Sequence, residues 1–106
     1  MKAQITPKTR NRITVPTDLV AELFEVDQAW QAGGDQVTIY CTKRSPNKLF
    51  VVPSSSVLPK GATPVLESTV DLYGNITFGV NKFVRSEIIN PGPVTATYQK
   101  GKIAIS

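Results

Sequence analysis

The chain contains no histidine and only one cysteine, and these absences remove most of the side chains used for catalysis and metal binding. Histidine is the commonest general base and metal ligand in proteins. Cys41 alone can form neither an internal disulfide nor a cysteine-based zinc site, and it has no histidine partner for nucleophilic catalysis. We therefore expect a protein that is not an enzyme and that uses no metal and no cofactor.

Long apolar runs are missing as well. No stretch is apolar for the length that a membrane-spanning helix needs. Lys2 is followed by polar residues and Pro7, which does not resemble a signal peptide. We expect a cytoplasmic protein that does not bind a membrane.

What the chain does have is the composition of one compact domain with a basic surface. It has 106 residues, of which 41% are hydrophobic and 19% charged, so a globular core is expected and disorder is not. The net charge of +4 permits nucleic-acid binding without requiring it. The charge is uneven, because residues 1–17 carry Lys2, Lys8, Arg10 and Arg12 and no acidic residue.

A similar pattern occurs twice. The segment Arg12-Ile13-Thr14-Val15-Pro16 and the segment Asn75-Ile76-Thr77-Phe78-Gly79 each lead into a short apolar-periodic stretch. Two strand-like segments follow each of them, at 37–40 and 49–52 and then at 94–98 and 102–105. One half is too small to bury a core of its own, so the halves should share one. We predict a single domain over 1–106, with a first half at 1–53, a linker at 54–64 rich in proline and serine, and a second half at 65–106.

Local patterns predict the elements within each half. Residues 3–5 and 12–15 indicate strands joined by a polar turn, and the alternation places Val15 on a buried face. The apolar residues between 17 and 24 share one helical face, and Val80 to Ile88 has a similar one. Phe24 and Trp30 are expected in the core or in an interface. Tyr73 lies in a turn and could stack on a base or a partner, or simply cover the turn.

The pattern of a basic residue followed by Ile13-Thr14-Val15-Pro16 and a short helix resembles the AbrB/MazE-like swapped-hairpin family. In that family two copies of the unit interleave into one small barrel, usually as a homodimer, and bind DNA with their first strands and turns. The resemblance implies a mainly β fold with two short helices, in which two tandem repeats of one chain form a pseudo-two-fold swapped-hairpin β-barrel. The chain would be a monomer with pseudo-dimer symmetry or a homodimer.

The basic turn before the second strand is the best candidate site. Its residues are Lys8, Thr9, Arg10, Asn11 and Arg12. Arginine can contact phosphate or guanine in a bidentate manner, lysine can neutralise phosphate, and a two-stranded ribbon can enter a major groove. Lys82 and Arg85 share one helix face and could contact phosphate from the second half, although they could equally be a solvated helix surface. Lys43, Arg44 and Lys48 bracket another hairpin and could extend the basic patch.

The expected function is therefore that of a transcription regulator or antitoxin-like protein that binds double-stranded DNA. The alternative is a protein-interaction module that inhibits or modulates another protein, with the basic turn serving only solubility. The asymmetry of the halves favours this alternative, because the turn from Asp71 to Asn75, which corresponds to the basic turn, carries a net negative charge.

Overall fold

The computed structural model describes residues 2–8 and 11–106 and contains eight β-strands, two α-helices and one 3-10 helix in that part of the chain. The first half contributes β1 (Lys2–Ile5), β2 (Arg12–Val15), α1 (Thr17–Phe24), η2 (Ala29–Ala32), β3 (Gln36–Thr42) and β4 (Leu49–Pro53). The second half contributes β5 (Ala62–Thr69), β6 (Ile76–Gly79), α2 (Asn81–Arg85), β7 (Val94–Gln99) and β8 (Lys102–Ile105). The expected fold class, mainly β with two short helices, is confirmed.

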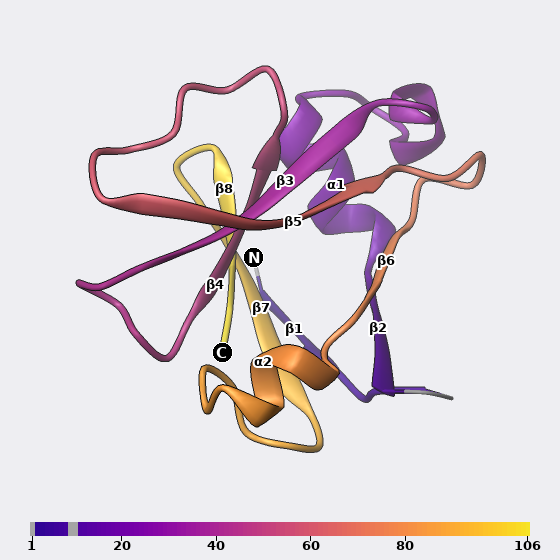
Figure 1. The fold of residues 1–106 in the computed structure, drawn as a ribbon. Coiled ribbons are helices and arrows are strands. Elements are labelled where there is room, and N and C mark those ends of the chain that lie inside the picture. The colour runs from indigo at the N-terminus through magenta and orange to yellow at the C-terminus, as the bar shows by residue number, and fades with distance from the viewer. Residues whose placement is uncertain (1, 9–10) are drawn as a thin grey trace.

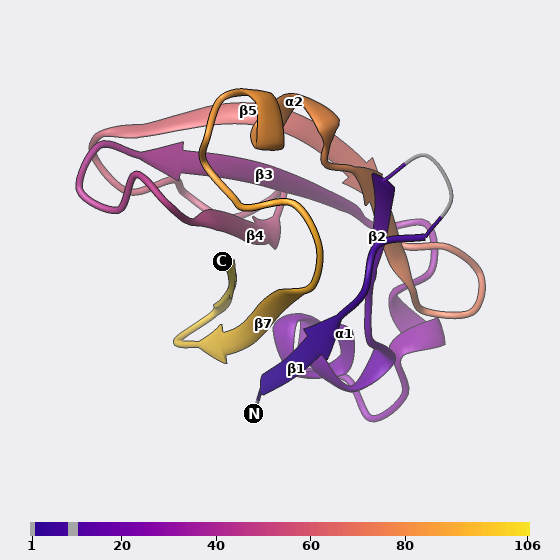
Figure 2. The ribbon, with the colours of Figure 1, turned by 90° about the horizontal axis from the view of Figure 1, so that it is seen from below.

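The strands form two antiparallel sheets. One has six strands in the order β1-β7-β8-β4-β3-β5, and the other is a ribbon of β2 and β6 (Figure 1). Neither sheet closes on itself in the part of the chain that is described, so both are open sheets. Figure 2 shows how the larger sheet curves, with β3, β4 and β5 along one side, β7 and β1 along the other, and β2 across the end.

Strands of the two halves pair with each other as well as within their own half, where β3 pairs with β4 and β7 with β8. β1 pairs with β7, β3 with β5, and β4 with β8. In the ribbon, Thr14 lies opposite Thr77, and their hydroxyl oxygens are 3.0 Å apart. The two halves are therefore held together by main-chain hydrogen bonds in both sheets.

Period-two alternation separates the two faces of the large sheet. Val37 and Ile39 of β3 face the main core, whereas Tyr40 faces outward. Along β4, Leu49 and Val51 point inward while Phe50 and Val52 point outward. The main core collects inward-facing side chains of both sheets and both helices, including the fully buried Ile13, Val15, Leu19, Ile76 and Phe83. A second, smaller cluster of Tyr40, Phe50, Val52 and Ala104 covers the outer face of the large sheet.

The two helices end in the same way. Glu25 after α1 and Glu87 after α2 both adopt positive φ, 56° and 60°. In each case the next N–H, of Val26 or of Ile88, donates to a carbonyl five residues earlier. An apolar residue follows each glutamate, as is frequent at such helix ends: Ile88 packs against the core, and Val26 is half-buried.

The structure separates the two aromatic residues expected in the core or in an interface, and it moves one boundary. Phe24 is half-buried and packs against the core, whereas Trp30 lies in η2 with 60% of its surface exposed, so the interface remains the expectation for Trp30. Residues 62–64, expected in the linker, form the start of β5, with a register shift near Tyr40. Pro64 is tolerated there because β5 is an edge strand of the sheet, where a proline without an N–H need not break a ladder.

Candidate nucleic-acid interface

The basic turn of residues 8–12, called the first turn from here on, joins β1 to β2. The Lys8 N–H donates to the Arg12 carbonyl over 2.8 Å, which closes the turn, and Asn11 adopts a φ of 52°. Asparagine tolerates this left-handed conformation better than most residues. Lys8, Asn11 and Arg12 are all exposed. Thr9 and Arg10, the other two residues expected in the site, lie outside the described residues.

Hydrogen bonds fix the first turn to the start of α2. The Val80 N–H donates to the Asn11 backbone carbonyl over 2.9 Å, and the Asn11 side-chain Nδ2 donates to the Asn81 side-chain Oδ1 over 2.7 Å. The structure therefore brings the basic turn beside the helix that carries Lys82 and Arg85, seventy residues later in the sequence. Residues 1–17 and 72–86, which supply this surface, contain no aspartate or glutamate.

Lys82 and Arg85 differ in how available they are. The Lys82 ammonium donates to the Val65 carbonyl over 2.6 Å and lies 5.2 Å from the centre of the Phe83 ring. It is therefore directed toward β5, and a phosphate would have to compete with that hydrogen bond. Arg85 is exposed at the end of α2. Arg85 lies about one helical turn beyond Asn81, the residue of α2 that contacts the first turn.

The second turn, residues 71–75, has the same main-chain closure but the opposite chemistry. The Asp71 N–H donates to the Asn75 carbonyl over 2.9 Å, and Gly74 has the positive φ that Asn11 has in the first turn. The Asp71 carboxylate accepts from the N–H groups of Tyr73 and Asn75, each over 2.9 Å. This carboxylate would repel phosphate, so the second turn is not expected to bind DNA.

The second turn is also covered, whereas the first is open. Gly74 is buried, and a Cβ atom built on it would lie 2.5 Å from the Ala29 Cβ and 2.7 Å from the Trp30 nitrogen. The Gly34 N–H donates to the Val70 carbonyl, and the Val70 N–H donates to the Asp35 carbonyl. The segment from η2 to Asp35 thus packs on the second turn and ties it to the start of β3.

The contact at Gly74 gives a stability prediction. We expect Gly74→Ala to lower the free energy of unfolding by about 2–5 kcal/mol, because it adds the left-handed strain of a Cβ residue to overpacking against Ala29. Thermal melts of both proteins measure this. Gly61→Ala is the matched control, since Gly61 has a similar φ of 86° with no atom near its Cβ position, and it should cost only about 1 kcal/mol. Equal losses of unfolding free energy in the two variants would contradict the close contact between Gly74 and Ala29.

Charges of opposite sign occupy different parts of the chain. Seven of the eight acidic residues lie at 13–42 and 61–81, and these two stretches contain no lysine or arginine. Six of these seven, all but Glu67 of β5, lie in α1, beside η2 or in the second turn, which occupy one end of the molecule (Figure 1). A polyanion would therefore be repelled from this end and attracted to the first turn.

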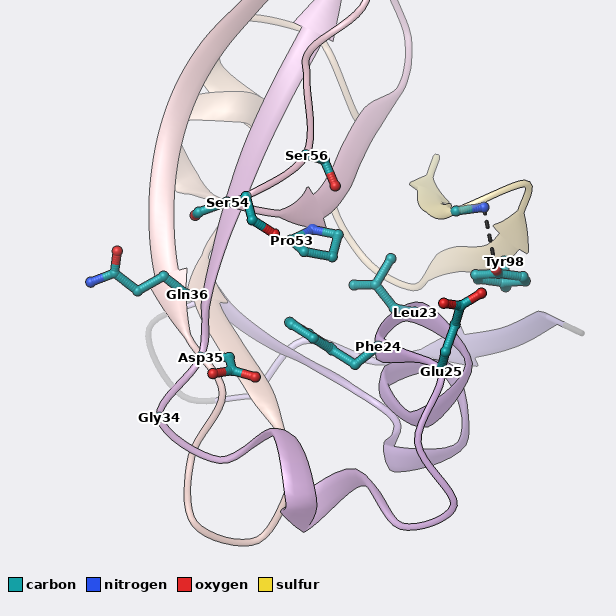
Figure 3. A pocket seen from close by; sticks show the side chains of 12 residues that line it. Leu23, Phe24, Glu25, Gly34, Asp35, Gln36, Pro53, Ser54, Ser56 and Tyr98 are labelled. Atoms are coloured by element: carbon teal, nitrogen blue, oxygen red, sulfur yellow. Dashed lines mark hydrogen bonds between the residues drawn. The ribbon is translucent and has the colours of Figure 1, made fainter.

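A cavity of about 660 Å³ lies at the acidic end, between α1, the start of β3 and the loop after β4. In Figure 3, the Phe24 ring lies between the carboxylates of Glu25 and Asp35, with Pro53 and Ser54 above it. Tyr98 closes the side near Glu25, and its hydroxyl accepts from the Gly101 N–H over 3.2 Å. With two carboxylates and no cation among its lining residues, this cavity does not suit phosphate.

Within the described ranges, no group of three or more acidic or cysteine side chains is arranged to hold a metal ion. None of the described helices has the length and apolar character needed to span a membrane.

Comparison with known proteins leaves the family open. No protein-family model, no curated protein and no solved structure matches this chain.

Proposed function

We propose that the chain binds double-stranded DNA through the first turn, with Arg85 as an additional phosphate contact, and acts as a transcription regulator or antitoxin-like protein. The observation that carries the proposal is the exposed, acid-free junction of Lys8, Asn11 and Arg12 with α2. The β2–β6 ribbon holds this turn in place, and two-stranded ribbons fit a major groove. Lys8 would neutralise phosphate, and the arginines would contact phosphate or guanine.

We further propose that the fold consists of two swapped-hairpin repeats around a pseudo-two-fold axis. In this relation β1 corresponds to β5, β3 to β7 and β4 to β8. When each strand of the large sheet is replaced by its counterpart, the strand order becomes β5-β3-β4-β8-β7-β1, which is the observed order read from the other edge. The pairs Thr14–Thr77 and Phe50–Ala104 would lie on the axis, because the flanking pairs are symmetric about them. The first and second turns close with the same main-chain hydrogen bond, and α1 and α2 are both followed by a glutamate with positive φ, which supports the same two-fold relation. The two sheets would then enclose the shared core in the manner of a small barrel, within a monomer or within each chain of a homodimer.

The test is a fluorescence titration of labelled duplex DNA at two salt concentrations. Lys8→Ala should weaken binding to all sequences and lower the salt slope by about one, because one phosphate contact is lost. Arg12→Ala should cost about 1–3 kcal/mol if it loses a bidentate base contact. The triple change of Lys8, Arg10 and Arg12 to alanine should lower the slope by about 2.7 where all three cations contact phosphate, and by less where an arginine contacts a base instead.

A triple change of Lys43, Arg44 and Lys48 to alanine is the matched control, since it removes the same charge from the β3–β4 hairpin. It should leave duplex affinity nearly unchanged. Full, salt-dependent affinity in the folded first-turn triple variant would show that the first turn is not the site. Absence of salt-dependent binding by the parent protein would overturn the DNA proposal altogether.

A specific observation favours the second candidate function, a protein-interaction module. Trp30, Leu72 and Tyr73 are 60%, 83% and 79% exposed, and they lie on two segments whose backbones touch at Gly33 and Gly74. Large apolar side chains gathered on one surface are typical of protein interfaces, where tryptophan and tyrosine contribute most of the binding energy. This surface lies at the acidic end, away from the first turn, so a protein partner and DNA would not compete for it.

A further inference from the structure

The outer face of the large sheet carries a cavity that neither candidate function uses. It has a volume of about 620 Å³ and lies beside the small outer cluster, under the linker between β4 and β5. Its lining includes Tyr40 and Phe50 together with Lys43, Arg44, Lys60 and Lys102. The β2–β6 ribbon packs on the opposite face of the sheet, so this cavity is separate from the first turn.

All the charged residues that line this cavity are cations. Four of its ten lining residues are Lys43, Arg44, Lys60 and Lys102. The stretches that supply the lining, residues 36–66 and 88–106, contain no aspartate or glutamate. A neighbouring cavity of about 380 Å³ shares Tyr40, Pro59 and Lys102 with the first and adds Lys100. Cations spread over two adjoining cavities suit a ligand that carries several negative charges in a row.

Aromatic side chains form the inner wall. The rings of Tyr40 and Phe50 are stacked, with centroids 5.2 Å apart and planes 24° apart. The Lys102 ammonium lies 4.9 Å from the centre of the Phe50 ring, so a cation and an aromatic surface meet at one point. Burial raises the pKa of the Tyr40 phenol, which keeps its hydroxyl protonated and able to donate a hydrogen bond.

We propose that this cavity binds single-stranded nucleic acid. Proteins hold single strands by combining a positively charged groove with aromatic side chains that contact the bases. A base stacked within a duplex cannot enter a concave site, whereas an unpaired base can. The base would pack against Phe50 after Lys102 swings from the ring to a phosphate, and Lys43, Arg44 and Lys60 would neutralise the neighbouring phosphates.

The experiment is an anisotropy titration of a labelled single-stranded oligodeoxythymidylate with the full chain across a range of salt concentrations. The double change Lys60→Ala and Lys102→Ala should reduce the slope of log affinity against log salt by about 1.4, the value for two lost contacts to a single strand. Phe50→Leu keeps an apolar side chain without the ring and should weaken binding about tenfold, with a thermal melt confirming the fold.

The matched control is the double change Lys8→Ala and Arg12→Ala, which removes two cations from the first turn. It should leave single-strand affinity unchanged while it weakens duplex binding, so failure of this proposal and failure of the duplex proposal give different results. Three outcomes would overturn the cavity assignment: no binding of the oligonucleotide by the parent protein, unchanged affinity in the folded cavity variants, or equally effective competition by polyglutamate of equal charge, which would indicate a site for anions in general.

Discussion

Val15→Asp leaves the chain unfolded at neutral pH. Val15 is completely buried in β2 opposite Ile76, within the core that both halves share. An unpaired carboxylate there lies far from water, and its desolvation costs an amount comparable to the entire stability of a small domain, about 5–15 kcal/mol. We expect no cooperative thermal transition by circular dichroism and a collapsed or aggregated species by size-exclusion chromatography.

The same substitution at Val57 is the control. Val57 is 96% exposed in the linker, so Val57→Asp should melt at the temperature of the parent protein. A normal melt for Val15→Asp would mean that β2 is displaced by one residue, because such a shift moves every side chain of a strand to the other face.

The fragment 1–58 should not form a stable folded monomer. Within it β1 loses β7, β2 loses β6, and β4 loses β8, so three strands lose partners in the other half. β3 also loses β5, which leaves it paired with β4 alone. Since isolated hairpins are at best marginally stable in water, we expect either an unfolded chain or an obligate dimer that supplies the missing pairs from a second copy.

Circular dichroism and sedimentation measure the outcome for the fragment alone. Adding the fragment 59–106 is the control, because it contains β5 to β8 and should restore the native spectrum as a one-to-one complex. A folded monomer of 1–58 that needs no second chain would contradict the idea of a core shared between the halves.

Most elements could be predicted because their signals are local. The alternation over residues 12–15 predicts β2, and the apolar face over 17–24 predicts α1 within its observed bounds. The start of β5 could not be predicted in this way. Its residues 62–64 include Pro64 and have little alternation, and they become a strand only because β3 offers them a partner.

The candidate site was predictable in part. The charge of Lys8 and Arg12 and the turn between two strands are visible in the sequence, and the structure places both residues on an exposed surface. The hydrogen bond between the side chains of Asn11 and Asn81 was not predictable, because it joins residues seventy positions apart. The cationic cavity was missed for a similar reason. Lys43, Lys60 and Lys102 come from three separate segments, and only the outer face of the sheet gathers them around Phe50.

The position of β8 has a consequence for how the protein is made. β8 lies in the interior of the large sheet, between β7 and β4, although it is synthesised after the other strands of that sheet. Translation adds only about 5–20 residues per second, so β1 and β2 lack their partners, and β4 is paired with β3 on one edge only, while the second half is synthesised. The sheet can therefore be completed only after residues 102–105 have emerged, and the nascent chain presents open strand edges until then.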